Sequence, residues 1–111
     1  MIYKICEQAL WRQAQKDGLL RGSAADVRDG FIHFSTAEQL AATAAKHFAG
    51  ESDLVLLAVE AEALGAALKW EPSRGGDLFP HLYAPLPVAA VRWARPLESA
   101  PGGPLVPELA P

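Results

Sequence analysis

The sequence predicts a single domain of the α+β class. At 111 residues the chain has the length of one domain and is too short for two independent cores. Its residues are 50% hydrophobic and 21% charged, a balance typical of a folded globular protein. Runs of β-forming residues lie at 2–6, 31–34, 54–59 and 88–93, and helical periodicity appears at 7–17 and 36–50. We therefore expect two main helices packed on strands within residues 1–97.

The first strand is expected to pass directly into the first helix. Residues 2–6 are rich in β-forming side chains, and helix-forming residues follow from Glu7 onward. Apolar side chains then recur at helical spacing at Leu10, Trp11 and Ala14. Gly18 supplies a C-terminal cap, so the helix should end near Asp17 with Trp11 in the core.

A second strand and helix are expected after a surface connection. Residues 21–30 are rich in Gly, Ser and Asp, which predicts a loop, and residues 31–34 read as a short buried strand. Ser35 and Glu38 have the spacing of a capping box, with Ser35 as the cap. The helix would start near residue 36 and stop at Gly50, with an apolar face formed by Leu40, Ala41, Ala44, Ala45 and Phe48.

The central strand is expected at residues 54–59, an uninterrupted apolar run that suits a strand covered on both faces. Residues 60–68 favour a short helix and 68–71 an extended segment, and a Gly-containing loop at 72–77 follows. Residues 98–111 turn to Pro and Gly with little to bury, which predicts a loosely attached C-terminal tail.

Composition argues against several classes of protein. The formal charge is −3 and no block of Lys or Arg occurs, so binding to nucleic acid is not expected. Cys6 is the sole cysteine, which excludes an intramolecular disulfide and a cysteine-based zinc site. No apolar segment is long enough to cross a bilayer and the N-terminus does not resemble a signal peptide, so we expect a cytoplasmic protein. Nothing in the sequence indicates its oligomeric state.

The best site candidates begin in the segment Gly30-Phe31-Ile32-His33-Phe34-Ser35-Thr36. Side chains alternate across a strand, so Phe31, His33 and Ser35 should share one face. Gln39 lies one helical turn beyond Ser35, and its amide can reach the same cleft. With Thr36 these residues form a polar corner at a helix N-terminus, where backbone amides favour anions. Ser35 reads as a helix cap and not as a nucleophile, because no Gly-x-Ser-x-Gly elbow surrounds it.

The second candidate segment is Phe79-Pro80-His81-Leu82-Tyr83. Pro80 cannot donate to a strand ladder, which limits any strand here to an edge or a terminus. If the segment is extended, His81 and Tyr83 project together. Glu71 and Arg74 lie next to a flexible Gly pair at 75–76 and either close over a ligand or solvate the loop.

Histidine titrates near neutral pH and can act as an acid or a base. His33, His81 and Glu71 are therefore the catalytic candidates. The alternative is that both histidines are structural. No His-Glu-x-x-His spacing is present, so a metal site is not predicted.

These motifs resemble the bacterial family catalogued as domain of unknown function 952. The resemblance covers residues 2–97 and rests on residues 29–36, 38–39, 53–57, 70–71 and 79–83, with Ala84 where the family usually has Gly. It implies an ADP-ribosyltransferase-like fold with two small, mostly antiparallel sheets around a cleft. In active relatives of that fold group the cleft holds NAD, which makes NAD the candidate cofactor. The family's motif is not the known transferase motif, so no role carries over residue by residue.

Three functions remain open from the sequence. The first is a protein that binds a nucleotide-like or anionic small ligand, with Ser35, Thr36, Gln39, Arg74 and Tyr83 as ligand-binding residues. The second is an NAD-dependent enzyme of ADP-ribosyl type, in which His33 and Ser35 hold the ribose, Tyr83 contacts the base, and Glu71 or His81 assists transfer. The third is a protein-interaction module with structural histidines, for which exposed apolar surface at residues 79–86 would be the evidence.

Overall fold

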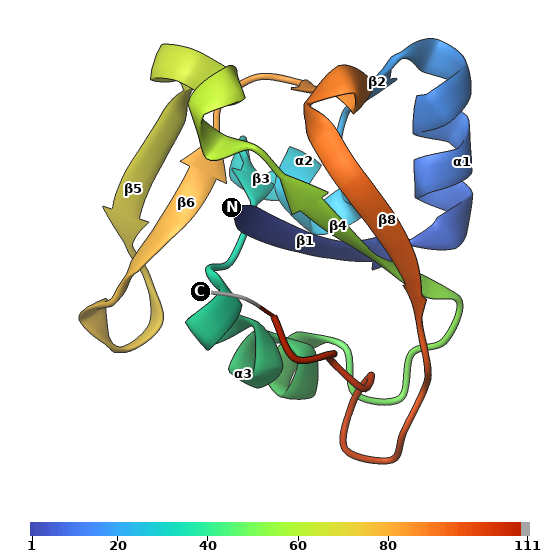
Figure 1. Ribbon diagram of the computed structural model, residues 1–111. Helices are drawn as coiled ribbons and strands as arrows, with labels where there is room; N and C mark the ends of the chain where they lie inside the picture. Colours follow the sequence, from blue (N-terminus) through green and yellow to red (C-terminus); the bar gives the residue numbers. More distant parts are fainter. Residues whose placement is uncertain (110–111) are drawn as a thin grey trace.

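The computed structural model describes residues 1–109, apart from the side chain of Arg74, and is organised around a three-stranded antiparallel sheet (Figure 1). Its strands are β1 (Ile2–Glu7), β4 (Leu54–Val59) and β8 (Val91–Leu97), in the order β1-β4-β8. Every residue of β4 is buried. The prediction of a central strand covered on both faces is confirmed.

Side-chain alternation divides the core into two clusters, one on each face of this sheet. Ile2 and Cys6 of β1 belong to the cluster that also contains Ala14 of helix α1 (Gln8–Asp17). Tyr3 and Ile5 belong to the other cluster, which is covered by helix α3 (Ala37–His47). In Figure 1 α3 lies on one side of the sheet and α2 on the other. Gly18 caps α1 at φ 83°, as the sequence predicts.

Two smaller antiparallel sheets complete the fold, so residues 1–109 form three sheets where two were expected. One pairs β2 (Leu19–Leu20) with β7 (Leu86–Pro87), and the other has the order β3-β6-β5, formed by β3 (Ile32–His33), β6 (Leu78–Leu82) and β5 (Leu68–Pro72). Three 3₁₀ segments connect these strands: Ala61–Ala67, Arg74–Gly76 and Val88–Ala90. Strands of two residues have no periodicity of their own, which explains why the extra sheet was missed.

Residues 21–30 are not a loop, because they contain the short helix α2 (Ala24–Asp29). The Ser23 side chain accepts from the Asp26 backbone N–H, and the Asp26 carboxylate accepts from the Ser23 N–H. Gly30 ends the helix in the left-handed region at φ 86°. The Ser and Asp that predicted a loop by composition are therefore the two members of a capping box.

Pro80 lies in the central strand of its sheet, which corrects the prediction of an edge or terminal position. It pairs with Trp70 of β5, and its carbonyl accepts from the Phe34 N–H at 3.0 Å. The neighbouring strand β3 ends at His33, which pairs with His81. The hydrogen-bond ladder between β3 and β6 therefore ends before it reaches Pro80, and no partner there requires a backbone N–H. The missing proline donor therefore leaves regular strand pairing intact.

The C-terminal segment packs against α3 and is not loosely attached. Gly103 and Pro104 are buried, and Val106 and Leu109 pack on the core cluster beneath α3. Gly103 has φ 128°, and a Cβ placed on it would lie 2.9 Å from the Ala44 carbonyl oxygen. Among residues 1–109, no helix combines the length and apolar character needed to span a membrane.

Replacing Gly103 by alanine should loosen this contact. Because the new methyl group meets helix backbone and the φ angle is unfavourable, Gly103→Ala should lower the free energy of unfolding by about 1–3 kcal/mol. Urea denaturation measures the change. Gly102→Ala is the matched control, since nothing lies within 4 Å of its added Cβ. Equal stabilities of the two variants would show that the segment is not held against α3.

Candidate functional site

The two predicted histidines lie side by side on neighbouring strands. His33 of β3 is the direct cross-strand partner of His81 of β6, and their ring centroids are 5.6 Å apart at an interplanar angle of 65°. Both line one cavity of about 540 Å³. Alternation along β3 turns Ile32 and Phe34 into the core, as predicted.

Phe31 completes an aromatic cluster around the two histidines. Its ring stacks on His81 with a centroid distance of 4.0 Å and an interplanar angle of 27°. It also lies 4.5 Å from the His33 ring and 5.2 Å from the Tyr83 ring. The orientation of the His81 ring is therefore restrained by packing as well as by hydrogen bonds.

A buried ion pair between Lys4 and Asp26 contacts His33. Lys4 lies on the β1 face that packs on the first core cluster, and its Nζ is 3.0 Å from Asp26 Oδ2. The same ammonium donates to the His33 carbonyl at 3.1 Å. Both side chains are almost fully buried, at 5% and 2% exposure, so each charge depends on the other for compensation.

Asp26 is the hub of this cluster. Its Oδ1 lies 2.6 Å from His33 Nδ1 and accepts from the His33 backbone N–H at 3.1 Å. Burial by itself raises the pKa of the Asp26 carboxyl, but the hydrogen bond from His33 and the charge of Lys4 outweigh burial and hold that pKa well below its usual range. Asp26 is therefore a carboxylate throughout the physiological pH range.

Both ring nitrogens of His33 face carboxylates. Nδ1 meets Asp26, and Nε2 lies 3.0 Å from Asp29 Oδ2. Asp29 also pairs with Arg28, and the pKa of its carboxyl is lowered mainly by that hydrogen bond. With both ring nitrogens in contact with carboxylates of α2, His33 has no ring nitrogen left for a ligand.

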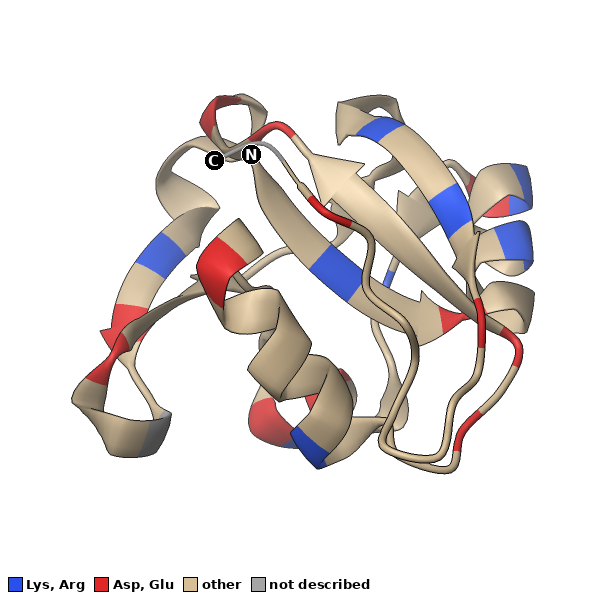
Figure 2. Cartoon of the chain, turned by 60° about the horizontal axis from the view of Figure 1, so that its bottom comes forward, with Lys and Arg blue, Asp and Glu red and all other residues tan. Residues whose placement is uncertain are grey.

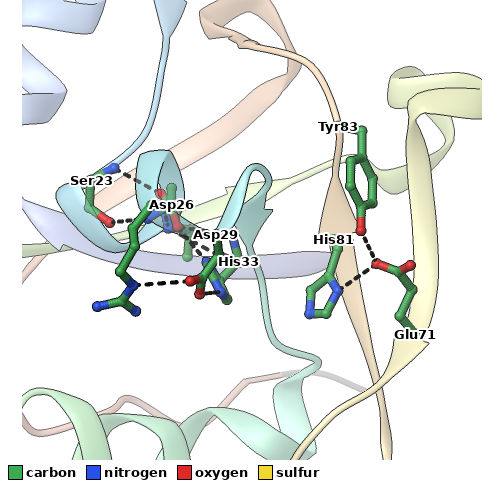
Figure 3. Close-up of polar contacts among 9 residues, drawn as sticks. Ser23, Asp26, Asp29, His33, Glu71, His81 and Tyr83 are labelled. Carbon is green, nitrogen blue, oxygen red and sulfur yellow. Dashed lines mark hydrogen bonds and ion pairs between the residues drawn. The ribbon is translucent and has the colours of Figure 1, made fainter.

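Glu71 connects His81 and Tyr83 (Figure 3). Of these three residues only His81 lines the cavity, so the predicted site residues Glu71 and Tyr83 lie beside it. One oxygen, Oε1, accepts from His81 Nδ1 at 2.8 Å and from the Tyr83 hydroxyl at 2.6 Å. The Tyr83 hydrogen bond and then the His81 hydrogen bond lower the pKa of Glu71, and the bond to Glu71 raises the pKa of Tyr83. The predicted residues His81, Glu71 and Tyr83 thus form one hydrogen-bonded unit.

The helix cap is Thr36, which corrects the assignment of that role to Ser35. The Thr36 side chain accepts from the Gln39 N–H, and Gln39 Oε1 accepts from the Thr36 N–H at 3.0 Å. The capping box is therefore displaced by one residue, because Ser35 pairs with Tyr3 of β1 as an isolated bridge. Ser35 Oγ hydrogen-bonds to Thr43 Oγ1 at 3.1 Å and lines the histidine cavity.

The remaining predicted ligand-binding residues do not join this cavity. Thr36 and Gln39 line a neighbouring cavity of about 520 Å³, and Gln39 Nε2 donates to the Leu78 carbonyl at 2.8 Å. Gln39 and His33 therefore line different cavities. The side chain of Arg74 lies outside the described part of the structure.

The comparisons with known proteins agree with the motif resemblance. The family model described as Protein of unknown function (DUF952) matches residues 5–94. The chain belongs to this family. No curated protein matches the sequence.

This member of the DUF952 family is also similar to a protein of solved structure, CC0527 from Caulobacter crescentus. The crystal structure of CC0527 has a TM-score of 0.90 and 55% sequence identity, covering 94% of this chain and 92% of that one. Its solution NMR structure has a TM-score of 0.81 and 56% identity, with 93% and 90% coverage. The similarity extends over nearly the whole fold described above.

Sequence reasoning missed Lys4, Asp26 and Asp29 in this DUF952 protein. One signal was available for Lys4, a charged residue on the core-facing side of an otherwise apolar strand. The Ser23-to-Asp26 spacing was a signal for α2. Nothing local indicated that the helix carboxylates would meet His33, because that contact depends on how α2 packs against β1 and β3.

The charges around the cavity are mixed. Among the described lining residues, Lys4 and Arg28 are cationic and are each paired with a carboxylate at 3.0 Å, whereas the acidic lining residues are Glu7, Asp26, Asp29 and Glu51. Over the described chain, Figure 2 shows Lys and Arg at separate positions on several elements and not in one patch. No unpaired Lys or Arg among the described lining residues is therefore offered to a phosphate group.

Proposed function

We propose that this protein binds a nucleotide-like small ligand in the cavity between His33 and His81. The observation that carries the proposal is the pairing of the two rings, 5.6 Å apart, in one cavity of about 540 Å³. That volume lies within the range of about 300–1,000 Å³ typical of small-molecule sites. Because both histidines lie on paired strands and have carboxylate partners, the polar groups are held in place before a ligand arrives.

The charge distribution supports a particular orientation of such a ligand. The nucleoside part, and not the phosphates, would lie between the two histidines. Among the described lining residues, the cations Lys4 and Arg28 are already paired, and the carboxylates of Glu7 and Glu51 repel anions. The aromatic ring of His81, held in place by stacking on Phe31, lines the cavity, and aromatic faces favour stacking with bases by about 1–3 kcal/mol per base. A simple inorganic anion is a poorer match to this site.

The second candidate is an NAD-dependent enzyme of ADP-ribosyl type with an ADP-ribosyltransferase-like fold. The observation in its favour is the unit of Glu71, His81 and Tyr83, which links a carboxylate and a hydroxyl to the histidine that lines the cavity. The motif resemblance supplies NAD as the ligand. The interaction-module alternative has less support, since Phe79, Leu82 and Leu86 face the core.

A thermal-shift and calorimetric series tests the binding proposal. Adenosine, AMP, NAD, ADP-ribose and inorganic phosphate are compared on the wild type, His81→Ala and His33→Ala. We expect a nucleoside-containing ligand to raise the Tm, by an amount that corresponds to about 2.7 kcal/mol at 100 times its Kd. Its affinity should fall by at least about tenfold in His81→Ala, equivalent to about 1.4 kcal/mol.

Lys16→Ala, an exposed substitution on α1, is the control and should bind as the wild type does. Circular dichroism establishes that each variant is folded. If none of these compounds shifts the wild-type Tm, the binding proposal is wrong. Consumption of NAD under the same conditions, measured by release of nicotinamide, then separates the enzyme from the binding protein.

A further inference from the structure

The two paired histidines have different hydrogen-bonding states. His33 directs both ring nitrogens at carboxylates of α2. His81 directs only Nδ1 at a carboxylate, that of Glu71 at 2.8 Å. This difference assigns them different chemistry, because only a ring nitrogen with an available lone pair can accept a proton.

The contact with Glu71 sets the tautomer of His81. A carboxylate only accepts hydrogen bonds, so Nδ1 carries the proton and Nε2 of the neutral ring carries the lone pair. The Tyr83 hydroxyl donates to the same carboxylate oxygen, which restrains Glu71 in turn. Phe31 stacks on the ring at 4.0 Å and restricts its rotation.

Nε2 of His81 opens to the cavity. Within the described part of the chain, no hydrogen bond to this atom is present. Every fully buried side-chain nitrogen or oxygen there has a hydrogen-bond partner, so Nε2, which has none, is not fully buried. In Figure 3 the second ring nitrogen of His81 points away from Glu71, toward the side where His33 lies. The ring itself is only 7% exposed, so its one accessible polar atom is presented to the cavity and not to bulk solvent.

We propose that Glu71 and His81 form a general-base dyad, in which Nε2 of His81 takes the proton of a hydroxyl nucleophile acting on the bound ligand. The inference rests on the proposed function for the identity of that ligand, and water or a ligand hydroxyl is the nucleophile. In the step, the oxygen forms a bond to ribose C1′ of the ligand while its O–H bond breaks and the proton moves to Nε2. The glycosidic C–N bond breaks, and its electron pair leaves with the base. The proton returns to solvent when the product leaves.

Glu71 acts in this dyad as a positioning residue. Its carboxylate holds Nδ1–H in place and stabilises the imidazolium that forms when Nε2 is protonated. Among the described residues, three others that are charged or titratable lie near the ring. Lys69 is its cross-strand neighbour on β5, His33 lies on β3 and contacts the two α2 carboxylates, and Tyr83 shares the Glu71 oxygen. Of these, Glu71 is the group in direct contact with a ring nitrogen.

The reactivity of Nε2 can be measured with p-nitrophenyl acetate, a probe that needs no knowledge of the natural ligand. Nε2 attacks the acetyl carbon, the ester C–O bond breaks, and p-nitrophenolate leaves with its electron pair. Water then cleaves the acetyl-imidazole to acetate and restores the ring. We expect the wild type to hydrolyse the probe faster than free imidazole at equal concentration, and His81→Ala to lose about 10²-fold of kcat/KM.

The role of Glu71 is read from the pH profile. Glu71→Gln keeps an oxygen that can accept from Nδ1–H but removes the negative charge, so the midpoint of the pH–rate profile should move to lower pH. A ¹⁵N NMR spectrum should show His81 of the wild type as the Nδ1–H tautomer. Lys16→Ala, an exposed substitution on α1 away from the cavity, is the control and should leave the rate unchanged.

The outcomes separate this inference from the proposed function. Full probe hydrolysis in His81→Ala, or a Glu71→Gln profile that coincides with that of the wild type, would overturn the dyad even if nucleotides bind. Probe hydrolysis that depends on both residues, together with no binding of any nucleoside-containing compound, would leave the dyad standing and overturn the proposed ligand class.

Discussion

Asp26→Asn should lower the free energy of unfolding by about 3–5 kcal/mol, the cost expected when one partner of a buried ion pair is removed. The substitution leaves the buried Lys4 ammonium without its carboxylate and weakens the contact with His33 Nδ1. Asn also accepts fewer hydrogen bonds than the carboxylate, which now receives donors from His33, Ser23 and Lys4. Urea denaturation followed by circular dichroism measures the loss.

Asp29→Asn is the matched control for this prediction. Asp29 contacts the same histidine through its other nitrogen, but its side chain is 34% exposed. Exposed ion pairs are worth about 0–1 kcal/mol, so this variant should lose no more than that. Similar losses in the two variants would mean that the burial of Asp26 is not what makes its pair important.

The Asp26 carboxylate should also make the free energy of unfolding decrease at acidic pH. The pKa of Asp26 is lower in the folded protein than the value of about 3.9 expected for the unfolded chain. A depressed pKa contributes stability that is fully present above the unfolded pKa and is lost as pH falls toward the folded pKa. The wild type should therefore lose stability below about pH 4, and Asp26→Asn should lose less over the same interval. Parallel curves for the two proteins would refute this assignment.

Leu56→Ala and Leu57→Ala should each lower the free energy of unfolding by about 2–5 kcal/mol, the range for truncating a fully buried leucine. The two residues are adjacent on β4, both are 0% exposed, and they belong to different core clusters. Each variant therefore tests the packing of one face of the central sheet. Differential scanning calorimetry or urea denaturation gives the values.

Leu78→Ala is the control for the leucine series, because Leu78 is 51% exposed. Surface substitutions usually change stability by less than about 0.5 kcal/mol. A loss below about 1 kcal/mol for either Leu56 or Leu57 would contradict close packing on that face. The pair would also reveal whether the covering provided by α3 and the C-terminal segment is as effective as that on the opposite face.

Local patterns in the sequence were sufficient for most of the elements. Three of these patterns are the apolar run at residues 54–59, the helical spacing after Glu7 and the glycine at position 18. Each depends only on residues close together in the sequence, so each can be recognised without knowing the tertiary structure. Strand alternation likewise placed His33 on the opposite side from Ile32. The motif resemblance then indicated that the two histidine segments belong together, and the strand register pairs His33 with His81.

The errors arose where a longer-range contact competed with a local rule. Ser35 has the sequence of a helix cap, but pairing with Tyr3 takes up its backbone and transfers the cap to Thr36. Pro80 is tolerated in a central strand because the adjacent strand ends early. The C-terminal segment has few apolar residues, yet Gly103 fits against the backbone of α3 where any side chain would collide.

The sequence by itself determined the two main helices, the central strand and the residue types of the candidate site, because periodicity, capping and side-chain alternation are local properties. Only the tertiary structure decided how the two histidines differ. The ring of His33 contacts the Asp26 and Asp29 carboxylates of α2, whereas that of His81 keeps one accessible nitrogen, since hydrogen-bond partners from β1, α2 and β5 are set by packing between distant segments.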